Sequence, residues 1–481
     1  MRHSIMREKR LRPERRPFSS FALKAAAILF WLAVWQVCAL AFPLLLASPA
    51  AVFLRLCGLV VAEGFWGTVG FTLRRIALGF AFTVSAGVLL AALSRTFVPV
   101  RALVSPFVSL VGSTPVAAVS IICLMWAGSR NVSFVIAALM AFPVLYTGVL
   151  GGLDSIDPKL LEMADAFSLR GARRFLYLTV SQVLPYFLPA AKASLGLCWK
   201  AGVAAEVIGI PTGSLGERLY MAKLFFNMPD LFAWTAVIIL VSVACEKLFM
   251  LLLRAGSRWL ERATCEGRRR RPAPSVPAPD IRIDGLSKVF GGRPVLRELS
   301  LALPAGSFTV LMGPSGCGKT TLFNLLLGFT EPDAGTIVPA PVRAGRRAAC
   351  VFQEDRLIEN LSAAANIQLM CPDLPRADVL TMLAALGLGE DADKPAARLS
   401  GGMRRRTALA RALLCPSELL LLDEAFDGLD GIARERAMEA VRANRNGRTV
   451  LMITHSEEEA ARMGGAVVRL PAVPDGRIGG L

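Results

Sequence analysis

The feature that most constrains the fold is a series of long apolar runs that fills the chain up to about residue 253. Six runs approach the roughly 20 residues that a helix needs to cross the hydrocarbon layer of a membrane. They lie near 21–46, 74–93, 102–125, 132–151, 186–205 and 232–253. The composition agrees, because 54% of the 481 residues are hydrophobic and only 19% are charged. We therefore expect an all-α membrane domain of about six transmembrane helices.

The net charge of +17 would suit a nucleic-acid partner, but its distribution along the chain argues against one. Residues 1–24 carry +6, residues 254–271 carry +5, and residues 272–481 carry no net charge. Basic segments that flank the apolar half are typical of cytoplasmic membrane flanks. With an even number of spans, both termini lie in the cytoplasm. We expect contact with membrane lipid and no binding of nucleic acid.

Shifts in composition divide the chain into four parts. We expect a basic cytoplasmic tail over 1–20, a transmembrane domain over 21–256, an Arg- and Pro-rich cytoplasmic linker over 257–280 and an α/β domain over 281–481. In the last part, short apolar runs alternate with helical segments, a pattern typical of a sheet covered by helices. The ten cysteines are scattered and indicate neither a disulfide framework nor a metal site.

The strongest motif is the sequence GPSGCGKT, which matches G-x-x-x-x-G-K-[ST] between an apolar strand and a helical segment. Glycines let backbone N–H groups surround phosphate oxygens in such a loop. Lys319 would face the β- and γ-phosphates, and the Thr320 hydroxyl would bind Mg²⁺. We predict ATP and Mg²⁺ as cofactors, with a nucleotide site formed by Gly313, Ser315, Gly316, Cys317, Gly318, Lys319, Thr320 and Thr321.

Two acids end a second apolar strand, 419–422. Two carboxylates at the end of a buried strand are costly without a cation nearby. Asp423 therefore fits a ligand of Mg²⁺, and Glu424 fits the base that orients or deprotonates the attacking water. His455 ends another apolar run, from which a side chain could reach a γ-phosphate.

A third motif, LSGGMRRR, places small and hydroxyl residues at a helix start, where backbone N–H groups bind anions. Its anion-binding positions are Ser400, Gly401 and Gly402. With Gln353 and His455 in order, residues 281–470 resemble the ATP-binding cassette (ABC) family. The resemblance implies an ABC-type P-loop NTPase domain whose LSGG segment closes on the ATP of a second subunit. It also implies that Gln353 senses nucleotide and Mg²⁺ and touches the membrane half, and that Phe290 stacks on adenine.

The membrane half resembles the permeases of nitrate, sulfonate, taurine and bicarbonate importers over most of 25–253, mainly through 196–206 and 229–234. Glu162-Met-Ala164 partly matches the coupling-helix motif of binding-protein-dependent importers. The resemblance implies an ATP-driven importer half-transporter that takes a small anion from an extracytoplasmic substrate-binding protein. It would work as a homodimer in the cytoplasmic (inner) membrane, as a multi-pass protein with its ATPase domain in the cytoplasm. The fusion is unusual, because such systems keep permease and ATPase on separate chains.

Two other functions stay open at this stage, namely an ABC exporter with short loops and a membrane-anchored ATPase that moves no solute. Pairing with a different half-transporter is a further alternative to the homodimer. Ionisable groups inside a span are costly, so we expect Lys200 and Glu206 either to line the transport pathway or to pair internally. Lys192 is expected to extend toward the membrane surface. The residues do not identify the solute.

Overall fold

The computed structural model describes residues 20–169, 171–265, 278, 280–339 and 348–471. The predicted tail up to residue 19 and most of the predicted linker, from 266 to 277, lie outside these residues. The chain divides into two compact units. The first contains Met1–Tyr146 and Ala190–Phe249, and the second contains Thr147–Pro189 and Met250–Leu481.

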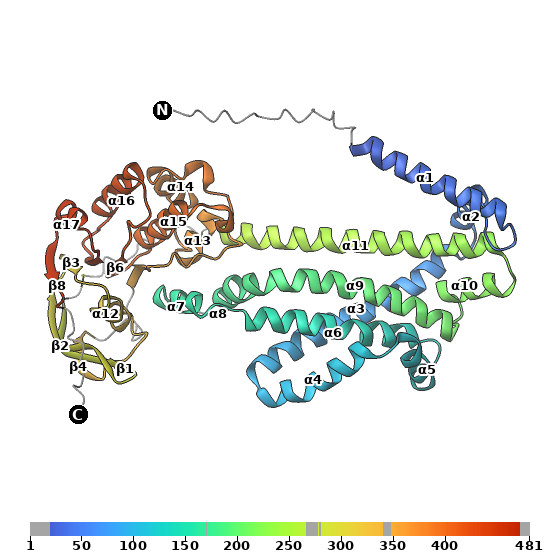
Figure 1. The fold of residues 1–481 in the computed structure, drawn as a ribbon, viewed down its shortest axis with the longest axis horizontal. Coiled ribbons are helices and arrows are strands. Elements are labelled where there is room, and N and C mark those ends of the chain that lie inside the picture. The colour runs from blue at the N-terminus through green and yellow to red at the C-terminus, as the bar shows by residue number, and fades with distance from the viewer. Residues whose placement is uncertain (1–19, 170, 266–277, 279, 340–347, 472–481) are drawn as a thin grey trace, which may run out of the picture. The chain divides into compact units, whose positions relative to one another are not determined.

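The described part of the N-terminal half consists of helices and short connections (Figure 1). Its helices are α1 (Ser20–Ala41), α2 (Pro49–Val61), α3 (Phe65–Thr96), α4 (Val98–Ser113), α5 (Val116–Ala127), α6 (Val132–Asp154), α7 (Pro158–Ala166), α8 (Gly171–Arg173), a π-helical turn (Arg174–Val180), α9 (Ser181–Gly209), α10 (Leu215–Leu224) and α11 (Met228–Cys265). The all-α membrane architecture expected for this half is confirmed.

The described helices give fewer clear spans than the six expected. Four are long and apolar enough to cross a membrane, namely Leu23–Ala41, Phe65–Thr96, Val132–Asp154 and Met228–Leu253. The expected span 102–125 is instead the pair α4 and α5, bent by 112°. The break follows from Pro115, which has no N–H donor and holds Thr114 in extended backbone. Helix α9 covers the expected span 186–205 but is not among these four.

Glycines allow helices α3, α6 and α9 to approach closely within the first unit. A Cβ atom at Gly79 would lie 2.9 Å from the carbonyl oxygen of Phe134, and one at Gly202 would lie 2.9 Å from Cγ1 of Ile76. Small residues at such contacts let backbones pack directly against one another, as is usual between membrane helices. Helix α3 therefore lies against both α6 and α9.

The described residues of the second half form two sheets. The antiparallel sheet has the order β2-β1-β4, and the parallel sheet has the order β5-β6-β7-β3-β8. The strands are β1 (Ile281–Phe290), β2 (Arg293–Leu303), β3 (Phe308–Met312), β4 (Ala334–Val338), β5 (Ala348–Val351), β6 (Leu419–Asp423), β7 (Thr449–Ile453) and β8 (Ala466–Arg469). The expected α/β class with a parallel sheet is confirmed.

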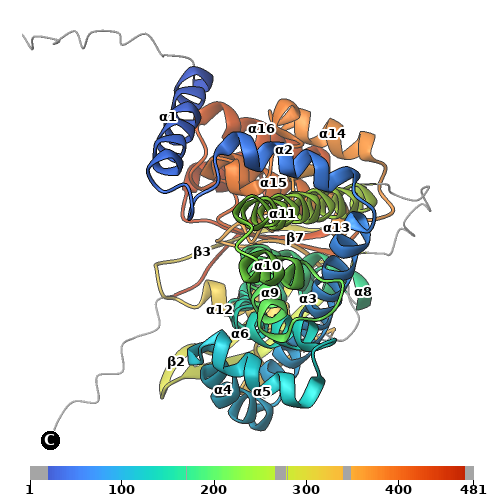
Figure 2. The same cartoon turned by 90° about the vertical axis from the view of Figure 1, so that its right-hand side faces the viewer.

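Helices cover both faces of the parallel sheet. They are α12 (Lys319–Leu326), α13 (Ala363–Met370), α14 (Arg376–Ala385), α15 (Gly401–Leu414), α16 (Gly431–Ala443) and α17 (Glu457–Met463), with 3₁₀ turns at Gly389–Asp391 and Ala396–Arg398. In both views α12 lies on one side of the sheet and α15 and α16 lie on the other (Figures 1 and 2). The central strands β3, β6 and β7 are buried along their whole length.

The expectation that the cysteines form no disulfide needs one correction. Cys371 and Cys415 are joined by a disulfide across 44 residues of sequence. They directly follow α13 and α15, whose packing brings the two C-terminal ends together. No sequence pattern marks this pair, because the contact depends on how two distant helices pack.

Candidate functional site

The strand register brings three of the predicted motifs to one edge of the parallel sheet. Ile453 of β7 pairs with Leu311 of β3 on one side and with Asp423 of β6 on the other. All three strands are parallel, so the segments that follow them emerge at the same edge. The GPSGCGKT loop, the Asp423–Glu424 pair and His455 therefore lie together.

The phosphate-binding loop has a tightly packed base and an exposed rim. Gly318 has φ +94°, and a Cβ atom there would lie 2.5 Å from Cδ2 of Leu296 and 2.8 Å from the carbonyl oxygen of Val295, both on β2. The side chains of Ser315 and Thr320 are exposed, whereas Cys317 is buried. The predicted binding role of Cys317 and Gly318 therefore rests on their backbone, while Ser315 and Thr320 present hydroxyl groups at the surface.

Lys319 is held inside this loop. Its ammonium group donates hydrogen bonds to the carbonyl oxygens of Gly313 at 2.8 Å and Pro314 at 2.9 Å. It also lowers the pKa of Asp423, opposing the effects that raise it, so the two charges interact across the site. The loop lysine and the β6 carboxylate are therefore close enough to interact electrostatically.

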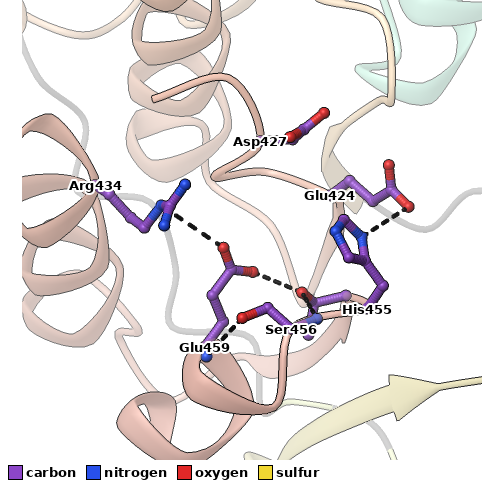
Figure 3. Close-up of a pocket in the computed structure, with 7 residues that line it drawn as sticks. Glu424, Asp427, Arg434, His455, Ser456 and Glu459 are labelled. Carbon is purple, nitrogen blue, oxygen red and sulfur yellow. Dashed lines mark hydrogen bonds and ion pairs between the residues drawn. The ribbon is translucent and has the colours of Figure 1, made fainter. Parts of the chain in front are cut away.

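The two acids at the end of β6 have different surroundings. Asp423 is 4% exposed, and burial, together with the neighbouring charge of Glu424, raises its pKa to about 6. Glu424 has the unusual φ of +48°, and its N–H donates to the carbonyl oxygen of Ile453 at 3.0 Å. That conformation directs its side chain toward His455, whose Nδ1 lies 3.6 Å from Oε1 of Glu424 (Figure 3).

Beside this pair is a cavity of about 150 Å³ that the sequence reasoning did not find. Its lining residues are Glu424, Asp427, Arg434, Thr454, His455, Ser456 and Glu459 (Figure 3). Glu459 accepts a 2.6 Å hydrogen bond from the Thr454 hydroxyl, and its N–H donates to Ser456 Oγ. The spacing Ser456-x-x-Glu459 is a capping signature that would have placed Glu459 at the start of the helix after His455. These bonds fix the turn that carries the histidine.

Gln353 follows β5 and is positioned by an arginine that sequence reasoning also missed. Arg405 of α15 donates to the carbonyl oxygens of Phe352 at 2.7 Å and Gln353 at 2.6 Å, and it pairs with Asp355. Because α15 begins at the LSGG motif, this arginine joins the motif's helix to the Gln353 segment. The Gln353 side chain itself is exposed.

Helix α7, which carries the expected coupling motif, contacts the segment after Gln353 within the same compact unit. Glu162 accepts from Arg356 at 2.9 Å, and Lys159 donates to Glu354 at 2.6 Å. Met163 is fully buried in the same apolar cluster as the strands of the parallel sheet. The motif therefore packs against the Gln353 region, as the resemblance implied.

The remaining predicted residues stand apart from the loop. Ser400 caps α15 by accepting from the Met403 N–H at 3.4 Å, and Gly402 lies against the carbonyl oxygen of Gly428. Phe290 is half exposed at the end of β1. Among the described residues, no hydrogen bond or ion pair joins 400–402 to the phosphate-binding loop. One chain thus presents the LSGG motif and the loop as separate surfaces.

Comparisons with known proteins agree with this geometry. The family model described as "ABC transporter" matches residues 296–427, and the model described as "Binding-protein-dependent transport system inner membrane component" matches residues 83–262. The chain is 44% identical to the aliphatic sulfonates import ATP-binding protein SsuB 1 of Nocardia farcinica, over 40% of this chain and 77% of that protein. The chain belongs to the ABC transporter family.

A second relative of this ABC transporter is the aliphatic sulfonates import ATP-binding protein SsuB 1 of Rhizobium johnstonii, 39% identical over 43% of this chain and 78% of that protein. Among solved structures, a dimeric bacterial ABC transporter cassette is 26% identical over 40% of this chain and 94% of that chain, with a TM-score of 0.37.

The two family models together define the type of transporter. A permease of the binding-protein-dependent type and an ABC ATPase occupy one polypeptide, so ATP hydrolysis is coupled to transport by the same chain. The permease match favours the importer over the exporter and over an ATPase that moves no solute. The apolar helices and this match make it a multi-pass membrane protein.

Proposed function

We propose that this ABC transporter imports a small organic sulfonate or a similar anion, delivered by an extracytoplasmic substrate-binding protein. The observation that carries the proposal is the combination in one chain of a binding-protein-dependent permease with a cassette similar to aliphatic sulfonate import ATPases. The substrate class is inferred from the relatives of the cassette, whereas the permease half would contact the solute itself.

The residues at the sheet edge fit MgATP. Asp423, Thr320 and Gln353 offer a carboxylate, a hydroxyl and an amide oxygen, the hard oxygen ligands that Mg²⁺ prefers. Asp423 is also a buried acid with no ion-pair partner among the described residues, so a bound cation would relieve the cost of its charge. When bound, Mg²⁺ would neutralise charge on the phosphate oxygens.

Within this site each remaining side chain has a separate task. Lys319 moves from the carbonyl oxygens of its own loop to the phosphates. Glu424 orients the attacking water and accepts its proton, because it directly follows Asp423 and its carboxylate retains solvent access. His455, next to Glu424, holds the γ-phosphate and keeps the carboxylate in place. Phe290 provides the stacking surface for adenine.

A homodimer completes the site. Ser400, Gly401 and Gly402 lie apart from the loop in one chain, so in our proposal they bind the γ-phosphate held by the partner's loop. The helix start at Ser400 offers free N–H groups for this purpose. ATP then favours the closed pair of cassettes, and α7 transmits closure to the permease.

We also propose the cytoplasmic (inner) membrane as the location, with the ATPase domain and both termini in the cytoplasm. The basic segments 1–24 and 254–271 support this orientation through the positive-inside rule. The proposed parts are those expected from the sequence: a tail over 1–20, a permease over 21–256, a linker over 257–280 and a cassette over 281–481.

ATPase stimulation tests the substrate class. The purified chain is reconstituted in nanodiscs with its cognate binding protein, and hydrolysis is measured with a panel of sulfonates, nitrate, sulfate and neutral solutes. We expect stimulation by an organic sulfonate. Stimulation by a neutral solute alone would contradict the proposal.

A further inference from the structure

The structure separates the two ionisable residues of α9 that the sequence grouped together. Glu206 is fully buried, and its Oε2 accepts from the Thr72 hydroxyl at 2.8 Å and from the Gly216 N–H at 3.3 Å. The buried guanidinium of Arg75 lies close enough to interact with its charge. A Cβ atom at Gly216 would lie 2.4 Å from Cβ of Glu206, so the carboxylate is closely packed. Oε2 of Glu206 therefore has internal partners, whereas Oε1 is buried with no hydrogen-bond partner among the described residues.

Lys200 has the opposite environment. Its side chain is exposed, and among the described residues it makes no hydrogen bond or ion pair. Lys192, two turns earlier in α9, forms an ion pair with Glu246 at 2.9 Å instead of only extending to the membrane surface as expected. Of the three charged residues in α9, Lys200 alone is exposed and has neither a hydrogen bond nor an ion pair among the described residues.

The rotation of α9 is fixed by two neighbours of Lys200. Cys198 donates to the carbonyl oxygen of Ala137, and Trp199 Nε1 donates to that of Ile238. Both side chains are buried, so the Lys200 side chain points out of the first unit. Ala193 and Leu197 are exposed on the same helical face, at the spacing of one and two turns.

Lys200 lies too far inside α9 for its side chain to reach the C-terminal end of the helix. Nine residues separate it from the end of α9 at Gly209, which is about 14 Å at 1.5 Å per residue. That is further than a lysine side chain extends. An unpaired ammonium group is costly when it faces lipid, so this face of α9 must meet water or polar groups.

We propose that Lys200 lies on the transport path and binds the anionic group of the solute as it crosses the membrane. The inference rests on the proposed import of an anion and deepens it by naming the selecting residue. In a homodimer two copies of the Lys200 face would border one path, giving a pair of cations around it, an arrangement used by pores that select anions. Glu206 is buried inside the first unit and is not exposed to that path.

The test is uptake of a radiolabelled alkanesulfonate into proteoliposomes that hold the full-length chain and its binding protein. We expect Lys200→Met to lower uptake about tenfold or more at low solute concentration, the scale of one lost charged hydrogen bond. Lys200→Arg should retain most of the uptake, because the charge remains. Lys192→Met is the matched control, since that ammonium already has a partner, and its uptake should stay within about threefold of wild type.

Three outcomes separate the inference from the proposed function. Normal uptake by Lys200→Met would overturn the role of Lys200 while leaving sulfonate import intact. Uptake of a neutral or cationic solute by wild type, without sulfonate uptake, would overturn both. If wild type imports another anion, loss of that uptake in Lys200→Met supports the role of Lys200, and normal uptake overturns it. Basal ATPase activity in detergent reports folding, and Lys200→Gln replaces the Met variant if that activity is lost.

Discussion

Two ion pairs join α7 to the Gln353 segment. Removing each of them should weaken the coupling between ATP hydrolysis and transport to a different extent. Lys159–Glu354 is largely exposed, with side-chain exposures of 49% and 61%, so it should contribute about 0.5 kcal/mol. Glu162–Arg356 is better shielded, because Arg356 is 15% exposed and stacks on the Phe352 ring at 3.8 Å. Losing Glu162 leaves that guanidinium without its carboxylate partner and should cost about 1–2 kcal/mol.

The assay is transport-coupled ATPase activity in proteoliposomes, expressed as stimulation by the loaded binding protein. We expect Glu162→Gln to reduce stimulation by about 5- to 30-fold, whereas Lys159→Gln reduces it less than about threefold. Basal hydrolysis should change little in either variant, because neither residue belongs to the nucleotide site. A double-mutant cycle with Arg356→Gln should show an interaction energy of about 1 kcal/mol.

The reasoning is refuted if Glu162→Gln and Lys159→Gln behave alike, or if the cycle with Arg356→Gln is additive. Either result would mean that packing of the α7 apolar face alone transmits the signal, independently of the charges. The exchange Glu162→Arg with Arg356→Glu should restore stimulation only in part, because the exchange also removes the contact between Arg356 and the Phe352 ring.

Three further predictions concern the cassette. Glu424→Gln should bind ATP normally but lose steady-state turnover. Nucleotide binding and phosphate release are measured on the same sample, and near-normal hydrolysis would exclude Glu424 as the base. Asp423→Asn should lose Mg²⁺-dependent turnover but raise the Tm of the nucleotide-free protein at pH 7.5, since burial raises the pKa of Asp423 to about 6. That pKa lies above the ordinary 3.8, so between these two pH values the folded wild type holds a proton that the unfolded chain has lost. Its free energy of unfolding therefore falls as pH rises through 6, and the Asn variant should lack this pH dependence. Gly318→Ala should weaken ATP binding more than Gly316→Ala, because both have positive φ but only position 318 adds a clash, 2.5 Å from Leu296; equal losses would exclude the clash as the cause.

The sequence predicted the cassette well because its chemistry is local. The GPSGCGKT loop, the acids after β6 and His455 each follow a short apolar strand, and parallel pairing brings such strand ends together without further information. Residues that hold these groups were missed, since their partners are distant in sequence. Arg405 binds the carbonyl oxygens of Phe352 and Gln353, and Arg434 pairs with Glu459 at 3.9 Å. Among the residues that position the site, only Glu459 is marked by a local pattern, the Ser456-x-x-Glu459 spacing.

The membrane half was harder to predict because apolar length does not specify the path of the chain. Pro115 explains the break within the expected span 102–125, but a proline does not by itself specify the 112° angle between α4 and α5. Lys200 and Glu206 look equivalent as charges in one apolar run. Their different burial follows from the rotation of α9, which Cys198 and Trp199 fix through contacts with α6 and α11.

The central claim is that one polypeptide carries out both hydrolysis and import. The direct measurement is ATP-dependent accumulation of labelled alkanesulfonate in proteoliposomes that contain this chain as their only membrane protein, with its binding protein on the face opposite the ATP. The account predicts accumulation above equilibrium in wild type and none in Glu424→Gln. Steady ATP hydrolysis by wild type without accumulation of any solute that its binding protein carries would contradict it.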